Sequence, residues 1–274
     1  MLGAITGDII GSVYEFNNTG RTDFPLFGRG ADFTDDTVLT VAVAEAIIEE
    51  RAFNRALQAW YARYPHCSYG GSFHSWARSG GSAPYNSWGN GSAMRVSPTG
   101  WVSEDADEVL RIAHDSAAVT HNHPEGIKGA QAVALAILLA RQGQSASAIA
   151  EDIAEAFDYR LDHDLDALRE TYEFDVSCQG SVPQAIACAL KGKDFEDSIR
   201  KAVSIGGDSD TIAAIAGSIA EARFGGVPEP ILRESWTRLP DTMRAVIRGF
   251  HQRFALPGEL PEDIESRQDL IVGR

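Results

Sequence analysis

The sequence predicts an all-α protein, folded as a compact orthogonal bundle of many helices around a binuclear metal site. Three observations predict this fold class. Apolar residues recur at helical spacing along almost the whole chain, no segment alternates with a period of two for long, and two helix starts each carry a pair of aspartates. The helix boundaries follow ordinary rules, since "PEGIKGAQAVALAILLARQG" begins with Pro124 and stops near Gly143.

The N-terminal stretch "MLGAITGDIIGSVYEF" predicts a buried first helix. It is apolar, but it lacks a basic region and carries Asp8 early, which is not typical of a signal peptide. If the helix continues, Asp8, Gly11 and Glu15 share one face, because they lie three and four residues apart. Glu15 is then either a solvated surface acid or a base or ligand at a cation site, and we expect Asp8 to pack or to cap.

The following segments repeat the helical pattern without a break in composition. Small residues in the helices expected at 125–141 and 211–224 allow close approach of helix backbones. The stretch 65–101 is the exception: it is rich in glycine, holds three of the five tryptophans, and predicts a long irregular segment that carries function. Since no repeat of fixed period appears, we expect a single domain over residues 1–274.

Composition excludes several classes of protein. The chain has 24 basic and 39 acidic residues, a formal net charge of −15, which disfavours nonspecific binding to nucleic acid or an anionic membrane. No uncharged apolar run reaches the roughly 20 residues that a membrane span requires. Three scattered cysteines fit a reducing compartment. We expect a cytoplasmic monomer.

The first pair of aspartates lies in "ADFTDDTVLT", directly before an apolar helical run. One interpretation is a helix cap, in which Thr34 caps and the acids favour the positive end of the helix dipole. The other is a Mg²⁺ or Mn²⁺ site formed by Thr34, Asp35 and Asp36, because hard cations bind carboxylate and hydroxyl oxygens. A cap needs only one of these side chains.

The second pair lies in "SIGGDSDTIAAIAG", where Asp208, Asp210 and Thr211 begin an Ala-rich helix after two glycines. Brought together, the two segments supply four carboxylates and at least two hydroxyls. That is enough for two cations about 3.5–4 Å apart, as in two-metal hydrolases. Weighed together, the two segments favour the metal site over two separate caps, because unmetallated carboxylates in one cluster would repel one another or bind protons.

Two further motifs offer polar groups for a ligand. In "SWGNGSAMR" the glycines at 89 and 91 allow backbone N–H groups to form a phosphate-binding nest, although Gly-Asn-Gly is also an ordinary turn. Trp88 either stacks on a base or packs in the core. In "THNHPEG", His121 either contacts a ligand or serves in capping and core hydrogen bonding.

These motifs, in this order and nearly from end to end, resemble the ADP-ribosylglycohydrolase family. The resemblance implies two Mg²⁺ or Mn²⁺ ions and hydrolysis of the glycosidic bond between ADP-ribose and an acceptor, which is a protein side chain or a small molecule. The partner is then an ADP-ribosylated protein or an ADP-ribose derivative. By position, it assigns the metal to Thr34, Asp35, Asp36, Asp208, Asp210 and Thr211. It assigns the diphosphate and distal ribose to Ser87, Gly89, Asn90 and Gly91, with Trp88 at an aromatic position and His121 at a ligand contact. Glu15 matches an acid near the second metal, and either Asp36 or Glu15 is the catalytic base.

Alternatives remain at this point. A non-catalytic ADP-ribose-binding or structural protein on the same scaffold is one, and a phosphohydrolase of the HD type, for which His114-Asp115 would be the signature, is another. The acceptor is also open: arginine, serine, a nucleobase or an acetyl ester.

Overall fold

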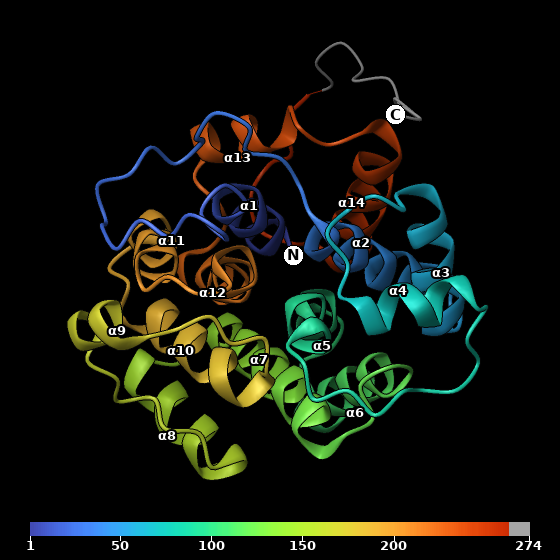
Figure 1. Cartoon of the computed structure of the whole chain (residues 1–274), viewed down its shortest axis with the longest axis horizontal. Helices are drawn as coiled ribbons and strands as arrows, with labels where there is room; N and C mark the ends of the chain where they lie inside the picture. The colour runs from blue at the N-terminus through green and yellow to red at the C-terminus, as the bar shows by residue number, and fades with distance from the viewer. Residues whose placement is uncertain (263–274) are drawn as a thin grey trace.

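The computed structural model describes residues 1–262, and these contain fourteen α-helices, one 3-10 helix and no β-strand. The all-α prediction is confirmed. In Figure 1, α1, α11 and α12 are seen nearly end-on, whereas α4 and α10 run across the view, so the helices cross steeply as expected for an orthogonal bundle. The elements are α1 (Leu2–Gly11), α2 (Asp35–Ile48), α3 (Phe53–Arg63), α4 (Gly71–Arg78), α5 (Gly91–Met94), η1 (Ser97–Trp101), α6 (Ala106–Ala118), α7 (Pro124–Arg141), α8 (Ala146–Phe157), α9 (Leu165–Thr171), α10 (Cys178–Lys191), α11 (Phe195–Ser204), α12 (Ser209–Phe224), α13 (Glu229–Trp236) and α14 (Asp241–Phe254).

The first helix and α12 form the tightest helix pair, and glycine makes it possible. All ten residues of α1 are buried, as the sequence predicts for this segment. A Cβ atom on Gly3 would lie 2.1 Å from the carbonyl oxygen of Gly217, and one on Gly7 would lie 2.0 Å from that of Ala213. A Cβ atom on Gly11 would lie 2.5 Å from the Cα of Asp210. The glycine stripe therefore brings the end of α1 directly against the start of α12.

The long helix α7 forms the other centre of the core, packed between α6, α10 and α12. Its alanine- and glycine-rich faces are buried, in agreement with the expectation of close helix approach. A Cβ atom on Gly126 would lie 2.6 Å from the carbonyl oxygen of Ser87. The loop that ends at α5 is thus seated directly on α7.

Two local expectations are wrong. The first helix ends at Gly11, and residues 12–17 form turns and a bend, so Glu15 does not continue the helical face of Asp8. The reason is tertiary: Gly11 meets the start of α12, and the chain turns away from it. The stretch 65–101 is not irregular throughout, because it contains α4, α5 and η1. Within residues 1–262, no helix combines the length and the apolar character that crossing a bilayer requires.

Candidate active site

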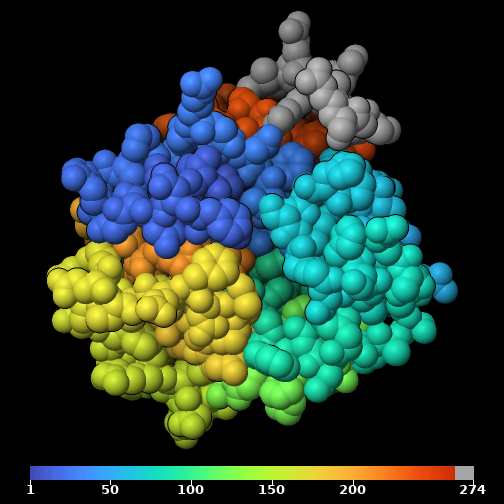
Figure 2. Space-filling view, in the orientation of Figure 1, coloured from blue at the N-terminus to red at the C-terminus, as the bar shows by residue number. Residues whose placement is uncertain are grey.

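A pocket of about 470 Å³ opens where several distant segments meet. It is lined by the segment after α1, the starts of α2 and α12, the loops before α4 and α5, and the loop before α10. Figure 2 shows the hollow, with the N-terminal segment in blue, residues near 90 in teal and residues near 175 in yellow around it.

The start of α2 is capped by side chains other than its two aspartates. Thr34 accepts a hydrogen bond from the backbone N–H of Asp36 at 3.3 Å, as the capping interpretation expects. Asp8, from α1, accepts hydrogen bonds from the backbone N–H groups of Thr34 and Thr37, each at 3.0 Å. Its carboxylate also accepts hydrogen bonds from both threonine hydroxyls. Because Thr34 and Asp8 cap α2, the carboxylates of Asp35 and Asp36 are not needed for capping and are free to bind a ligand.

Asp36 shows this surplus most clearly. Its Oδ2 accepts the hydroxyl of Thr211 at 3.3 Å, whereas its Oδ1 is buried and has no hydrogen-bond partner among the described residues. A buried carboxylate oxygen without a partner is costly. The contact with Thr211 also joins the start of α2 to the start of α12, two segments that the sequence predicts to meet.

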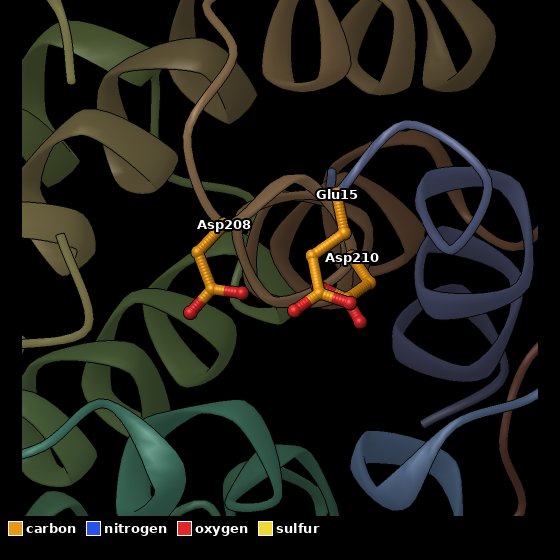
Figure 3. A group of neighbouring side chains, drawn as sticks. All are labelled: Glu15, Asp208 and Asp210. Atoms are coloured by element: carbon orange, nitrogen blue, oxygen red, sulfur yellow. The ribbon is translucent and has the colours of Figure 1, made fainter. Parts of the chain in front are cut away.

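The start of α12 carries the second half of the acid wall, the name we give to Glu15, Asp35, Asp36, Asp208 and Asp210. Asp208 occupies the N-cap position but makes no side-chain cap. Oxygen atoms of Glu15, Asp208 and Asp210 lie within 4.8 Å of one another. Figure 3 shows that these three carboxylates are directed to the same side, one from the segment after α1 and two from the start of α12.

Asn18 holds Glu15 in this position. Its Nδ2 donates to the carbonyl oxygens of Tyr14 at 2.6 Å and Gly207 at 3.0 Å, and its Oδ1 accepts the N–H of Gly207 at 2.9 Å. The bend that carries Glu15 is thereby fixed to the residues just before α12.

Burial and the charges of nearby carboxylates favour the protonated form of every member of the acid wall. Burial, followed by the charge of Asp8, raises the pKa of Asp35 to about 7. Burial, followed by the charge of Asp208, raises the pKa of Glu15 to about 7. The pKa values of Asp36 and Asp210 lie well above the usual 3.8 because of burial and then the charges of Asp210 and Asp208 respectively. Burial also raises the pKa of Asp208.

This donor set fits divalent cations of the hard type. Carboxylate and hydroxyl oxygens converge, one buried oxygen lacks a partner, and no described basic side chain forms an ion pair with any acid of the wall. Two cations would offset the repulsion that otherwise drives these groups to bind protons.

Another part of the pocket lining, which we call the donor wall, consists of Ser87, Gly89, Asn90, Gly91 and His121. The loop is tied to the segment before α10, because the N–H of Asn90 donates to the carbonyl of Val176 at 2.7 Å. The side chain of Asn90 donates to Oδ2 of Asp208 at 2.7 Å, which connects the two walls. His121 is buried and faces the glycines at 89 and 91.

Two predicted site residues lie outside the pocket lining. Thr34 is buried behind it, where its hydroxyl donates to Oδ1 of Asp8 at 2.7 Å. Trp88 is 54% exposed, and its ring packs edge-on against His123. Their roles as metal ligand and substrate contact stay predictions.

Sequence reasoning missed several residues that shape the site. Asn18 positions Glu15, and Arg95 is fully buried beside the donor wall. The expectation that Asp8 packs or caps is confirmed, because it caps the start of α2. Phe16 and Phe174 line the pocket at its mouth, where their rings stack with centroids 6.1 Å apart. Phe16 is 83% exposed, but this exposure is known only from the structure, so no sequence pattern marked the residue.

The HD-type alternative receives no support from the geometry. His114 and Asp115 lie on the exposed face of α6, where Nδ1 of the histidine is 3.2 Å from Oδ1 of the aspartate. Neither residue lines the pocket.

Comparison with known proteins places the chain in a family. The family model described as ADP-ribosylglycohydrolase matches residues 1–260. An uncharacterized protein of Archaeoglobus fulgidus is 34% identical over 231 residues, covering 73% of this chain and 74% of that protein. The human ADP-ribosylhydrolase ARH3 is 28% identical, with 86% of each chain covered. An ADP-ribosylarginine hydrolase of Pseudomonas putida is 25% identical, covering 87% of this chain and 74% of that enzyme.

A solved structure supports the fold independently. The ADP-ribosylglycohydrolase-related protein complex superimposes with a TM-score of 0.68 at 24% identity, covering 92% of this chain and 96% of that one. The match of the family model over nearly the whole chain, together with these relatives, shows that this protein belongs to the ADP-ribosylglycohydrolase family.

Proposed function

We propose that this protein is a metal-dependent hydrolase that cleaves the glycosidic bond between ADP-ribose and an acceptor. The observation that carries the proposal is the surplus of carboxylates at two helix starts that face one pocket. The caps of α2 are made by Thr34 and Asp8, so Asp35 and Asp36 are available to bind cations together with Asp208 and Asp210. The family, and relatives named as ADP-ribosyl hydrolases, agree with this activity.

Two Mg²⁺ or Mn²⁺ ions would be held by Thr34, Asp35, Asp36, Asp208, Asp210 and Thr211. When bound, they would supply Lewis-acid polarisation and lower the pKa of water, which makes water a ready nucleophile. The carboxylates of the acid wall would hold the two cations in a site that α1 and α12 close on one side.

The chain's own residues perform the other tasks. The diphosphate and the distal ribose are bound by Ser87, Gly89, Asn90 and Gly91. The exposed ring of Trp88 stacks on the nucleobase. Glu15 is suited to accept a proton from water, because its carboxylate lies beside those of Asp208 and Asp210 at the proposed cation site. Asp36 is the alternative base.

A second candidate function is binding of ADP-ribose without turnover. The donor wall alone supports it, because that wall needs no metal. The acid wall argues for catalysis, since a diphosphate ligand gains nothing from five carboxylates unless cations lie between them.

A panel of substrates tests the proposal. Purified protein is incubated with arginine-, serine-, nucleobase- and acetyl-linked ADP-ribose in Mg²⁺ or Mn²⁺, and free ADP-ribose is measured. We expect release from at least one substrate, abolished by EDTA and restored by excess cation. Tight binding of ADP-ribose with no release from any of the four would favour the binding function instead.

A further inference from the structure

A chain of buried hydrogen bonds leads from Arg95 to the donor wall. Nη2 of Arg95 donates to the carbonyl oxygen of Ser116 at 3.1 Å and to Oγ1 of Thr120 at 2.7 Å. The same Oγ1 lies 2.7 Å from Nδ1 of His121. Arg95 is fully buried, and among residues 1–262 it has no carboxylate partner. Its Nε and Nη1 also have no hydrogen-bond partner in this part of the chain. An arginine placed this way contributes little as an ion pair, so another role is needed.

His121 is neutral in this environment. Burial, and then the positive charge of Arg95, hold the pKa of His121 well below the ordinary 6.5. A neutral imidazole carries one proton, on either Nδ1 or Nε2, and the other nitrogen accepts hydrogen bonds. Which nitrogen carries the proton decides whether His121 donates to the pocket or accepts from it.

The hydroxyl of Thr120 decides between the two forms. It has one proton and two lone pairs, and the guanidinium, which cannot accept, takes one lone pair. The side chain of Tyr85 also hydrogen-bonds with Thr120. Because a phenol O–H is a better donor than the phenol oxygen is an acceptor, we assign it to the second lone pair of the hydroxyl. A hydroxyl that accepts from a cation becomes a stronger donor and a weaker acceptor. Its proton therefore points to Nδ1 of His121, which leaves the imidazole proton on Nε2.

The Nε2 atom faces the loop of the donor wall. A Cβ atom on Gly91 would lie 3.1 Å from Nε2, and one on Gly89 would lie 3.7 Å away. The ring is held from behind by Gly126, where a Cβ atom would lie 2.9 Å from the Cβ of His121. It is held from the side by Tyr85, whose ring meets it edge-on at 5.7 Å. The imidazole can neither turn over nor leave this position without a change in its neighbours.

We propose that Arg95 and Thr120 are positioning residues, which fix His121 as the neutral tautomer with its proton on Nε2, so that it donates a hydrogen bond to an acceptor oxygen of the diphosphate. Phosphate oxygens only accept hydrogen bonds, so the other tautomer would place a lone pair against them. The identity of the ligand rests on the proposed function, whereas the tautomer is a property of the ligand-free protein.

Nitrogen-15 NMR of the histidine side chains tests the tautomer directly. In the ligand-free wild type we expect His121, assigned with a His121→Gln variant, to show a protonated Nε2 and an unprotonated Nδ1. Thr120→Val keeps the shape of the side chain but removes the hydroxyl, so the other tautomer becomes populated. Thr120→Ser keeps the hydroxyl and restores the wild-type pattern.

Binding of ADP-ribose is measured by calorimetry on the same proteins. We expect Thr120→Val to weaken binding about tenfold, the loss of roughly one hydrogen bond, and Thr120→Ser to recover most of it. A proton on Nδ1 in the wild type, or an unchanged tautomer in Thr120→Val, would overturn the role of Thr120. A changed tautomer with unchanged affinity would overturn the contact with the diphosphate. Failure of the wild type to bind ADP-ribose would count against the proposed function, while the NMR result would still decide the tautomer.

Discussion

The acid wall and the donor wall of the pocket have opposite electrostatic character. The acid wall gathers five carboxylates, and burial together with the charges of nearby carboxylates raises the pKa of each. The donor wall offers backbone N–H groups and a neutral histidine, with the buried cation of Arg95 behind it. Arg95 remains charged at neutral pH, since burial lowers its pKa only to about 10.

Under the proposed function, this contrast suits a ligand with two chemically different ends. A diphosphate matches the donor wall directly. In the proposed function, the acid wall would receive a sugar hydroxyl or a glycosidic bond only after cations reverse its charge. The hydrogen bond from Asn90 to Asp208 fixes the spacing between the two walls, so each wall positions the ligand for the other.

The largest effect is expected from Asp210→Asn. The amide keeps Oδ1, which accepts the backbone N–H of Thr211 at 2.9 Å, but it removes a charge from the proposed cation site. We expect turnover to fall by about 10³-fold or more, as loss of several kcal/mol of metal-derived stabilisation implies. Steady-state kinetics and cation titration by calorimetry measure the loss.

Asp107→Asn is the matched control, because Asp107 is also an acid in the first turn of a helix but is exposed on α6. Its turnover should equal that of the wild type. In EDTA, Asp210→Asn should melt no lower than the wild type, since it relieves a buried charge. Full activity in Asp210→Asn would exclude Asp210 from the metal set.

The next effect is a pH dependence of stability in the metal-free protein. The pKa of Asp35 is about 7 in the folded protein against 3.8 ordinarily, and that of Glu15 is about 7 against 4.5. Between these values the folded state binds more protons than the unfolded chain, so the free energy of unfolding falls as pH rises from about 4 to 7. In EDTA, we expect the melting temperature to be about 5 °C higher at pH 5.5 than at pH 8.

Cations should reverse this trend. Added Mg²⁺ or Mn²⁺ should raise the melting temperature strongly at pH 8 and little at pH 5.5, because protons and cations compete for the same oxygens. In Asp210→Asn the difference between the two pH values should shrink. Melting curves in EDTA that are independent of pH would show that the pKa values of the acid wall are not raised in the metal-free protein.

The fold class and the two acid segments could be predicted because their signals are local. Helical periodicity needs only a short window, and two carboxylates beside a threonine exceed what one helix start needs. That redundancy, at Asp35-Asp36 and again at Asp208 and Asp210, pointed to cations before any contact was known. The proposed meeting of the two segments is seen in the contact between Asp36 and Thr211.

The remaining features depend on contacts that no local pattern encodes. Asp8 caps a helix that begins 27 residues later, so the sequence could not distinguish capping from ordinary packing. The end of α1 at Gly11 is decided by α12, about 200 residues away, and helical spacing therefore placed Glu15 on the wrong face. Within residues 1–262, Arg95 forms no ion pair that a pattern of opposite charges in the sequence could have indicated. The hydrogen bond between Arg95, just after α5, and Thr120, just after α6, depends on the packing of the two helices and has no sequence signal.

The smallest effect is expected on the donor wall, from Gly91→Ala. A methyl group there would lie 3.1 Å from Nε2 of His121, so it would fit with a shift of a few tenths of an ångström but would cover the donor. We expect the dissociation constant for ADP-ribose to rise about tenfold, with cation binding and melting temperature unchanged. Gly249→Ala, whose methyl would meet only Cδ1 of Ile48 at 3.6 Å, should leave the dissociation constant unaltered.

Because the acid wall is untouched in Gly91→Ala, an equal loss of cation binding would mean that the two walls do not act separately. An unchanged affinity for ADP-ribose would mean that the diphosphate lies elsewhere in the pocket.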